Sequence, residues 1–188
     1  MRSLARLVVF ALAFTTPLAV TLTTPLAAQR ITPAQLHGAL IGRWTGTLEY
    51  KDYSPPYGRV TLPTIFEIAP RKDGGVMLHA IYDDGPGKTV TSDDRFILSA
   101  DGATLDWTGT KEKTPEIFRV LVLSRDVSTQ EIRLVGEWEG ADDNKPATIR
   151  ETITLAASAL TVLKEVRFTG GTYSFRHEYR MTRASVAP

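Results

Sequence analysis

Alternating apolar and polar positions dominate the chain from about residue 44 onward. This period-2 pattern is typical of strands with one buried face, and clusters of Gly, Pro, Asp and Asn separate the segments that carry it. Strands are predicted over 44–53, 60–69, 76–83, 89–98, 104–107, 116–125, 131–140, 147–155, 160–168 and 172–183. About ten strands joined by short turns predict an antiparallel meander that closes into a barrel, because closure removes exposed sheet edges.

One short helix is predicted before the strands. Thr32 can cap it, Pro33 suits its first position, and Gln35 completes a capping box. Apolar residues at helical spacing follow, and Gly42 ends the helix. The predicted fold is therefore all-β, an up-and-down β-barrel of about ten strands with a short N-terminal helix, in a single lipocalin-like domain over 29–188.

The N-terminal segment has the pattern of a secretory signal peptide. Arg2 and Arg6 are followed by the uncharged apolar run 7–20, and the small residues of 26–28 suit a cleavage site. The apolar run is short for a membrane anchor, and prolines interrupt the segment. We expect residues 1–28 to be removed, and the protein to be periplasmic or extracellular with no integral membrane span in the mature chain.

Composition then narrows the possible chemistry. The chain has 22 Lys and Arg against 21 Asp and Glu, and removal of the leader leaves 20 basic residues and a net charge of −1. Without a basic cluster, the chain is not expected to bind nucleic acid. It has no cysteine and three histidines, which excludes disulfides, Cys-ligated metals and a thiol nucleophile. Acidic pairs at predicted turns could suggest calcium but usually form turns, so no metal site is predicted.

Predicted turns fix which residues face one another across neighbouring strands. On one face they align Glu137, Arg150, Glu165 and Arg176 in a row of alternating charge. Opposite charges across strands are favourable, so this row supports the register. We interpret it as part of the solvent face.

The opposite face must point into the barrel, and the same register places charged groups on it. The predicted inward row is Arg119, Gly136, Glu151, Lys164 and His177, with Tyr179 near it. Buried charges are costly unless paired or hydrated. The row is either a self-satisfied ion network or a binding site in which Arg119 and Lys164 meet an anionic head group and apolar walls hold the tail.

The segment Gly42-Arg43-Trp44, following a helix and opening a meander, resembles the calycin superfamily of lipocalins and fatty-acid-binding proteins. The resemblance implies that an Arg of the last strand, here Arg183, packs over Trp44 where the barrel closes, with Gly42 beside them as a structural closure. The strand number is closer to fatty-acid-binding or nitrobindin-like barrels than to true lipocalins. The resemblance also implies a small apolar or amphipathic ligand in the barrel.

We therefore predict an exported protein that binds an amphipathic or apolar ligand in the barrel without a cofactor. Four alternatives remain open. Nitrobindin-like barrels hold haem iron through a late-strand histidine, here His177. Glu151, Lys164, His177 and Tyr179 could instead serve an isomerase or cyclase acting on a lipid-like substrate. The remaining two are a structural envelope protein with a filled core and an outer-membrane barrel, in which Lys164 would face hydrocarbon at a cost of about 2–4 kcal/mol.

Overall fold

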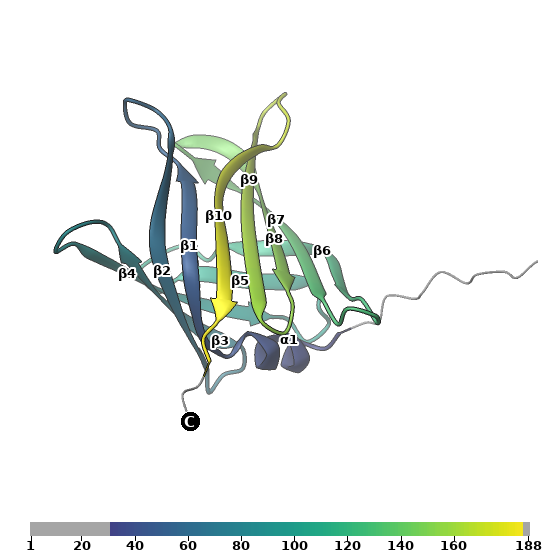
Figure 1. Ribbon diagram of the computed structural model, residues 1–188. Coiled ribbons are helices and arrows are strands. Elements are labelled where there is room, and N and C mark those ends of the chain that lie inside the picture. The colour runs from purple at the N-terminus through teal and green to yellow at the C-terminus, as the bar shows by residue number, and fades with distance from the viewer. Residues whose placement is uncertain (1–30, 186–188) are drawn as a thin grey trace, which may run out of the picture.

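Ten antiparallel strands close into a barrel in the computed structural model, which describes residues 31–185 (Figure 1). The strands are β1 (Gly42–Lys51), β2 (Arg59–Pro70), β3 (Val76–Asp83), β4 (Thr89–Leu98), β5 (Thr104–Gly109), β6 (Ile117–Arg125), β7 (Ile132–Asp142), β8 (Lys145–Leu155), β9 (Ala159–Phe168) and β10 (Ser174–Arg183). Each strand pairs with its neighbours in the chain, and β1 also pairs with β10. The predicted fold class is confirmed, while the proposed signal peptide, 1–28, lies outside the described residues.

The helix α1 (Pro33–Leu40) lies across one end of the barrel (Figure 1). The predicted capping box is present, since Thr32 and Gln35 each accept a hydrogen bond from the other's backbone N–H. Leu36 and Leu40 of α1 are buried in the barrel core. The helix therefore closes this end of the barrel.

Gly42, Trp44 and Arg183 meet where the barrel closes, as predicted. Trp44 pairs with Arg183 across β1 and β10, and the guanidinium lies 4.0 Å from the centre of the indole ring. Arg183 also donates hydrogen bonds to backbone oxygens next to α1, including that of Ile41 at 2.7 Å. At Gly42 the φ angle is +133°, and a Cβ would lie 2.8 Å from Arg183 Nη1. This contact joins the helix to both closing strands.

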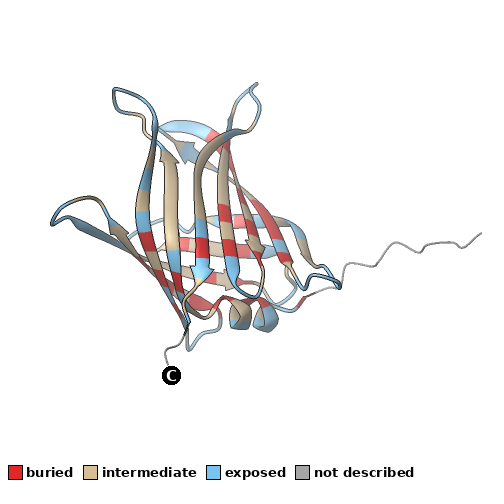
Figure 2. Ribbon diagram, viewed as in Figure 1, coloured by how far each residue is buried: buried red, intermediate tan, exposed pale blue. Residues whose placement is uncertain are grey.

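The apolar core fills the half of the barrel next to α1. Buried segments gather there on several neighbouring strands (Figure 2). The largest fully buried side chains include Trp44, Phe66, Phe118, Leu105, Leu134 and Ile149. The inward face is therefore apolar here, as the alternation predicts.

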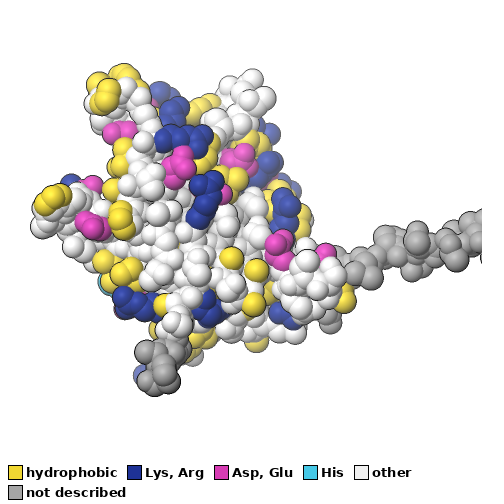
Figure 3. Space-filling view, in the orientation of Figure 1, with side chains coloured by type: hydrophobic (Ala, Val, Ile, Leu, Met, Phe, Trp, Pro, Cys, Tyr) yellow, Lys and Arg dark blue, Asp and Glu magenta, His cyan; other side chains and the backbone are white. Residues whose placement is uncertain are grey.

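Charged residues of both signs lie together on the outside, as in the pairs over β1 and β10 (Figure 3). The predicted pairing of Arg150 with Glu137 and Glu165 is confirmed. The predicted place of Arg176 is wrong, because a β-bulge between Phe175 and His177 removes it from the ladder. Arg176 instead bonds to Asp142, with Nε 3.0 Å from the carboxylate oxygen.

A second irregularity turns Arg119 out of the barrel. The predicted pairing of Arg119 with Gly136 would place Leu123 opposite Ile132, but Leu123 pairs with Leu134. The pairing of β6 with β7 then shifts by one residue between Val120 and Val122, and Arg119 lies opposite Glu137. Its side chain is 74% exposed, 3.8 Å from the outer carboxylate of Glu137. The prediction that Arg119 faces inward is therefore wrong, because a one-residue shift moves a side chain to the other face.

Candidate functional site

A cavity of about 220 Å³ lies in the barrel interior, beside the apolar core. Its walls come from β4, β5, β6, β8, β9, β10 and the β5–β6 loop. The lining residues are Asp94, Trp107, Gly109, Glu112, Glu116, Phe118, Glu151, Lys164, His177 and Tyr179. Because Glu112 is exposed, the cavity reaches solvent at the β5–β6 loop.

Four of the five predicted ligand-binding residues line this cavity. Glu151 pairs with Lys164 across β8 and β9, and Lys164 pairs with His177 across β9 and β10, as the predicted register requires. Tyr179 follows two residues after His177 on the same face, with its ring centre 5.2 Å from the imidazole. The structure thus brings Glu151, Lys164, His177 and Tyr179 together, and only Arg119 lies elsewhere.

Phe118 occupies the interior position that was assigned to Arg119. It is 1% exposed, lines the cavity and packs against Gly136. A Cβ on Gly136 would lie 3.0 Å from the Cβ of Phe118. The missing side chain of Gly136 thus makes room for an aromatic ring and not for a guanidinium.

Three acidic residues that the sequence analysis missed complete the site. Asp94 lies on β4 in the same parity as the inward Phe96 and Leu98, a signal that could have found it. Glu112 comes from the β5–β6 loop, where no alternation exists to orient it, and Glu116, at the end of this loop, shares the parity of the inward Phe118. Four carboxyl groups and one lysine therefore line the cavity, and Arg119, which was predicted to lie beside Lys164, is not among them.

Glu151 is the most deeply buried ionisable group in the cavity wall. It is 5% exposed, and its Oε2 atom has no hydrogen-bond partner. Burial raises the pKa of this carboxyl to about 8, against the opposing effect of Lys164. A large fraction of Glu151 is therefore protonated at neutral pH.

The lysine does not neutralise the acidic groups by direct contact. None of the ion pairs within 4.0 Å among residues 31–185 includes Lys164. Burial, and secondly the nearby charge of Lys164, lower the pKa of His177 to about 3. The imidazole is thus neutral at physiological pH, and the groups of the predicted row are not a self-satisfied ion network.

Desolvation acts in the same direction on Asp94, Glu116 and Tyr179. Burial raises the pKa of Asp94 although the Trp107 indole N–H donates to it at 3.3 Å. Burial also raises the pKa of Glu116, where Lys164 acts in the opposite sense. Tyr179 shares a 3.0 Å hydrogen bond with Tyr82, and burial raises its pKa well above the usual value. Burial in the cavity thus disfavours the ionised, negatively charged forms of these groups.

The apolar half of the interior has almost no free space. A void of about 10 Å³ remains there, between side chains that include Leu40, Phe96 and Leu160. A volume of this size holds at most one water molecule. Within the barrel, any ligand of appreciable size must therefore occupy the polar cavity.

The polar cavity does not fit haem, although the neutral His177 imidazole suits a metal. Pockets for drug-sized ligands measure about 300–1,000 Å³ and are mostly apolar, whereas this one has about 220 Å³ and four carboxyl groups. In the part of the chain that the structure describes, no three His, Asp or Glu side chains are arranged to hold a metal ion.

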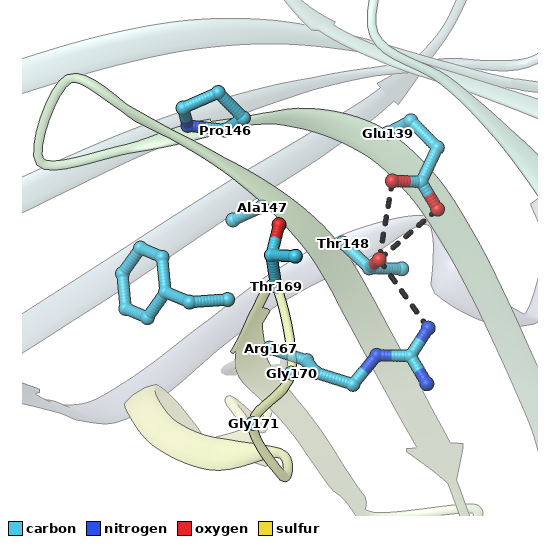
Figure 4. Close-up of a pocket in the computed structure, with 9 residues that line it drawn as sticks. Glu139, Pro146, Ala147, Thr148, Arg167, Thr169, Gly170 and Gly171 are labelled. Atoms are coloured by element: carbon cyan, nitrogen blue, oxygen red, sulfur yellow. Dashed lines mark hydrogen bonds between the residues drawn. The ribbon is translucent and has the colours of Figure 1, made fainter.

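A larger hollow of about 460 Å³ lies on the outer surface, between β8 and the β9–β10 turn (Figure 4). Its polar side chains bond to one another: Arg167 donates to Thr148 at 3.3 Å, and Thr148 donates to Glu139 at 3.0 Å. Because these groups are already partnered, the outer hollow offers fewer free contacts to a ligand than the inner cavity.

Comparisons with known proteins show the fold. No known family model and no curated protein matches the chain. The crystal structure of Rv2717c from M. tuberculosis is similar, with a TM-score of 0.60, 13% identity, and coverage of 84% of this chain and 100% of that one. A protein of unknown function from the DUF3598 family of Nostoc punctiforme has a TM-score of 0.40 and 13% identity, over 87% of this chain and 53% of that one.

Within residues 31–185, no helix has the length and apolar character that crossing a membrane requires. The similarity to Rv2717c, at this identity, establishes a shared barrel fold and does not carry a function. The barrel is consistent with ligand binding.

Proposed function

We propose that the protein binds a small polar or amphipathic molecule in the barrel cavity. The observation that carries the proposal is the unpartnered Oε2 atom of Glu151 in the wall of a 220 Å³ cavity. A buried polar atom without a partner is costly, and a ligand that bonds to it would remove this cost. Glu151, Lys164, His177 and Tyr179 are the proposed ligand-binding residues.

The size of the cavity limits the ligand. Its volume of about 220 Å³ equals that of about seven water molecules at about 30 Å³ each. The packed apolar core leaves no space for a long tail. The proposed ligand is therefore a molecule of about seven non-hydrogen atoms with a short apolar part, and not the lipid-like molecule expected from the sequence.

Titration with three four-carbon probes of different charge tests this proposal. We expect at least one of butylammonium, butanol and butyrate to bind and to change the tryptophan fluorescence, since Trp107 lines the cavity. Gly109→Leu, which adds a side chain at the cavity wall, should abolish the change. Thr169→Leu, which adds the same side chain at the outer hollow, should leave it intact.

Failure of all three probes to bind the folded wild-type protein would contradict the proposal. So would binding that survives Gly109→Leu but is lost in Thr169→Leu, because the ligand would then occupy the outer hollow. Circular dichroism of each variant verifies that the barrel has folded.

We further propose that the protein is exported. The basic residues Arg2 and Arg6 and the apolar run 7–20 support this location. The intact mass of the protein recovered from expressing cells should correspond to a chain without residues 1–28. Recovery of the uncleaved chain alone would overturn the proposal.

A further inference from the structure

We propose that the ligand carries a substituted ammonium group, which the barrel cavity holds between its carboxyl groups and its aromatic walls. This inference rests on the proposed function and adds the chemical class of the ligand. It also reverses the sign of the head group expected from the sequence, since Arg119 lies outside and acidic groups line the cavity.

The charges that face the cavity favour a cation. Carboxyl groups come from three directions: Asp94 on β4, Glu112 and Glu116 on the β5–β6 loop, and Glu151 on β8. Lys164 on β9 is the one basic side chain among the lining residues, and His177 on β10 is neutral at physiological pH. A cationic ligand would lessen the repulsion among these carboxylates, whereas an anionic ligand would increase it.

Glu151 supplies the specific contact. The residue is 5% exposed, and its carboxyl atom Oε2 has no hydrogen-bond partner. An ammonium N–H can donate to this oxygen, and hydrogen bonds between charged groups are about twice as strong as neutral ones. The acidic cluster thus contains an unsatisfied acceptor in the cavity wall.

The aromatic walls suit the rest of such a ligand. Trp107 on β5, Phe118 on β6 and Tyr179 on β10 all line the cavity. Aromatic side chains attract organic cations through their ring faces, and they also bury alkyl groups. This combination favours an organic ammonium over a hydrated inorganic ion, for which aromatic walls provide no ligands.

The ion 3,3-dimethylbutylammonium and its uncharged isostere, 3,3-dimethylbutan-1-ol, test the charge on one carbon skeleton. Both have seven non-hydrogen atoms, in accord with the cavity volume. Isothermal titration calorimetry of the full-length folded protein at pH 8 should show the ammonium binding at least about tenfold more tightly than the alcohol, because only the ammonium N–H forms a hydrogen bond between two charged groups.

Two matched variants locate the contact. Glu151→Gln keeps the shape of the side chain and should weaken binding of 3,3-dimethylbutylammonium about tenfold while leaving the affinity for the alcohol unchanged. Glu139→Gln, on the outer surface of β7, should change neither. A second inner variant, Asp94→Asn, should weaken binding of the ammonium even if Glu151→Gln were to fold poorly.

Several results would overturn the inference without affecting the proposed function. They are equal affinities for 3,3-dimethylbutylammonium and the alcohol, tighter binding of butyrate or of Ca²⁺ than of this ammonium, and unchanged affinity for the ammonium in both folded inner variants. The proposed function itself fails only when no probe of any charge enters the cavity.

Discussion

Gly136 decides which side chain its neighbour on β6 can place inside the barrel. Its backbone has no positive φ angle, so the reason for a glycine here is space and not conformation. A Cβ would approach the Cβ of the fully buried Phe118 to 3.0 Å. Because Phe118 also lines the cavity, this one position links core packing to the shape of the candidate site.

Gly136→Ala should therefore destabilise the protein. Overpacking of a tight core typically costs about 1–3 kcal/mol, which urea unfolding can measure directly. Gly38→Ala is the control, since a Cβ there meets no atom within 4 Å and an Ala within a helix is favoured by about 0.5–1 kcal/mol. If Gly136→Ala were as stable as the wild type, Phe118 would not occupy the space beside Gly136.

Single side chains also mark where sequence reasoning succeeds and fails. The inward positions of Glu151, Lys164 and His177 follow from the turns on either side of β8 and β9, and the structure confirms them. Arg119 could not be placed, because the apolar run 120–123 has no alternation that reveals its register. The bulge lies within that run.

Among the elements, short hairpin turns allow the pairing of residues on neighbouring strands to be predicted most reliably. Asp143 and Asn144 form the β7–β8 turn with φ angles of +49° and +59°, a conformation that these residue types tolerate. The turn is tighter than the predicted loop 142–146, yet the pairing of Gly140 with Ala147 is unchanged. Ten strands and one helix could thus be predicted from alternation and turn residues.

Elements without tight turns were harder to place. The β6–β7 connection spans 126–131 and the β5–β6 loop 110–116, and a longer loop does not fix the residue opposite its far end. The β5–β6 loop contributes Glu112 and Glu116 to the cavity. The place of Glu112 therefore depends on tertiary packing that local patterns do not encode, whereas Glu116 continues the inward parity of Phe118.

At the scale of the whole molecule, the interior divides into two zones with different tasks. The apolar zone beside α1 is packed and stabilises the barrel without any disulfide, as a chain without cysteine must. The cavity at its side retains ionisable groups that desolvation destabilises. Such perturbed groups often mark functional sites, so the location of this strain agrees with the proposed binding site.

The ionisable groups of the cavity have different pKa values in the folded and unfolded states, so the free energy of unfolding should depend on pH. Between its unfolded pKa of 4.5 and its folded pKa of about 8, Glu151 binds a proton in the folded state but not in the unfolded state. Its effect is therefore to lower the stability as the pH rises through this range. His177 acts oppositely: between about 3 and 6.5 the unfolded state binds the additional proton, so stability is lost as the pH falls.

Because the effects of Glu151 and His177 cancel between about pH 4.5 and 6.5, the free energy of unfolding should be nearly constant there. It should decline at lower and at higher pH. Asp94 and Glu116, whose pKa values are also raised, increase the loss on the alkaline side, while Lys164 moderates it. Glu151→Gln removes the contribution of Glu151, because an amide does not titrate. In urea unfolding, the stability of this variant relative to wild type should rise by about 1.4 kcal/mol for each pH unit between pH 5 and 8.

Glu139 is an exposed residue on the same barrel, and Glu139→Gln is the control. The free energy of unfolding of this variant should change with pH as that of the wild type does. A constant difference between Glu151→Gln and wild type over the same range would mean that Glu151 ionises alike in both states, and the desolvated cavity would be refuted. Raising the pH to 8 should lower the free energy of unfolding, because the folded state disfavours the ionised Glu151. A bound cation should raise it again, because the cation favours the ionised carboxylate in the folded state. The 3,3-dimethylbutylammonium ion should therefore raise the unfolding free energy of the wild type more at pH 8 than at pH 5.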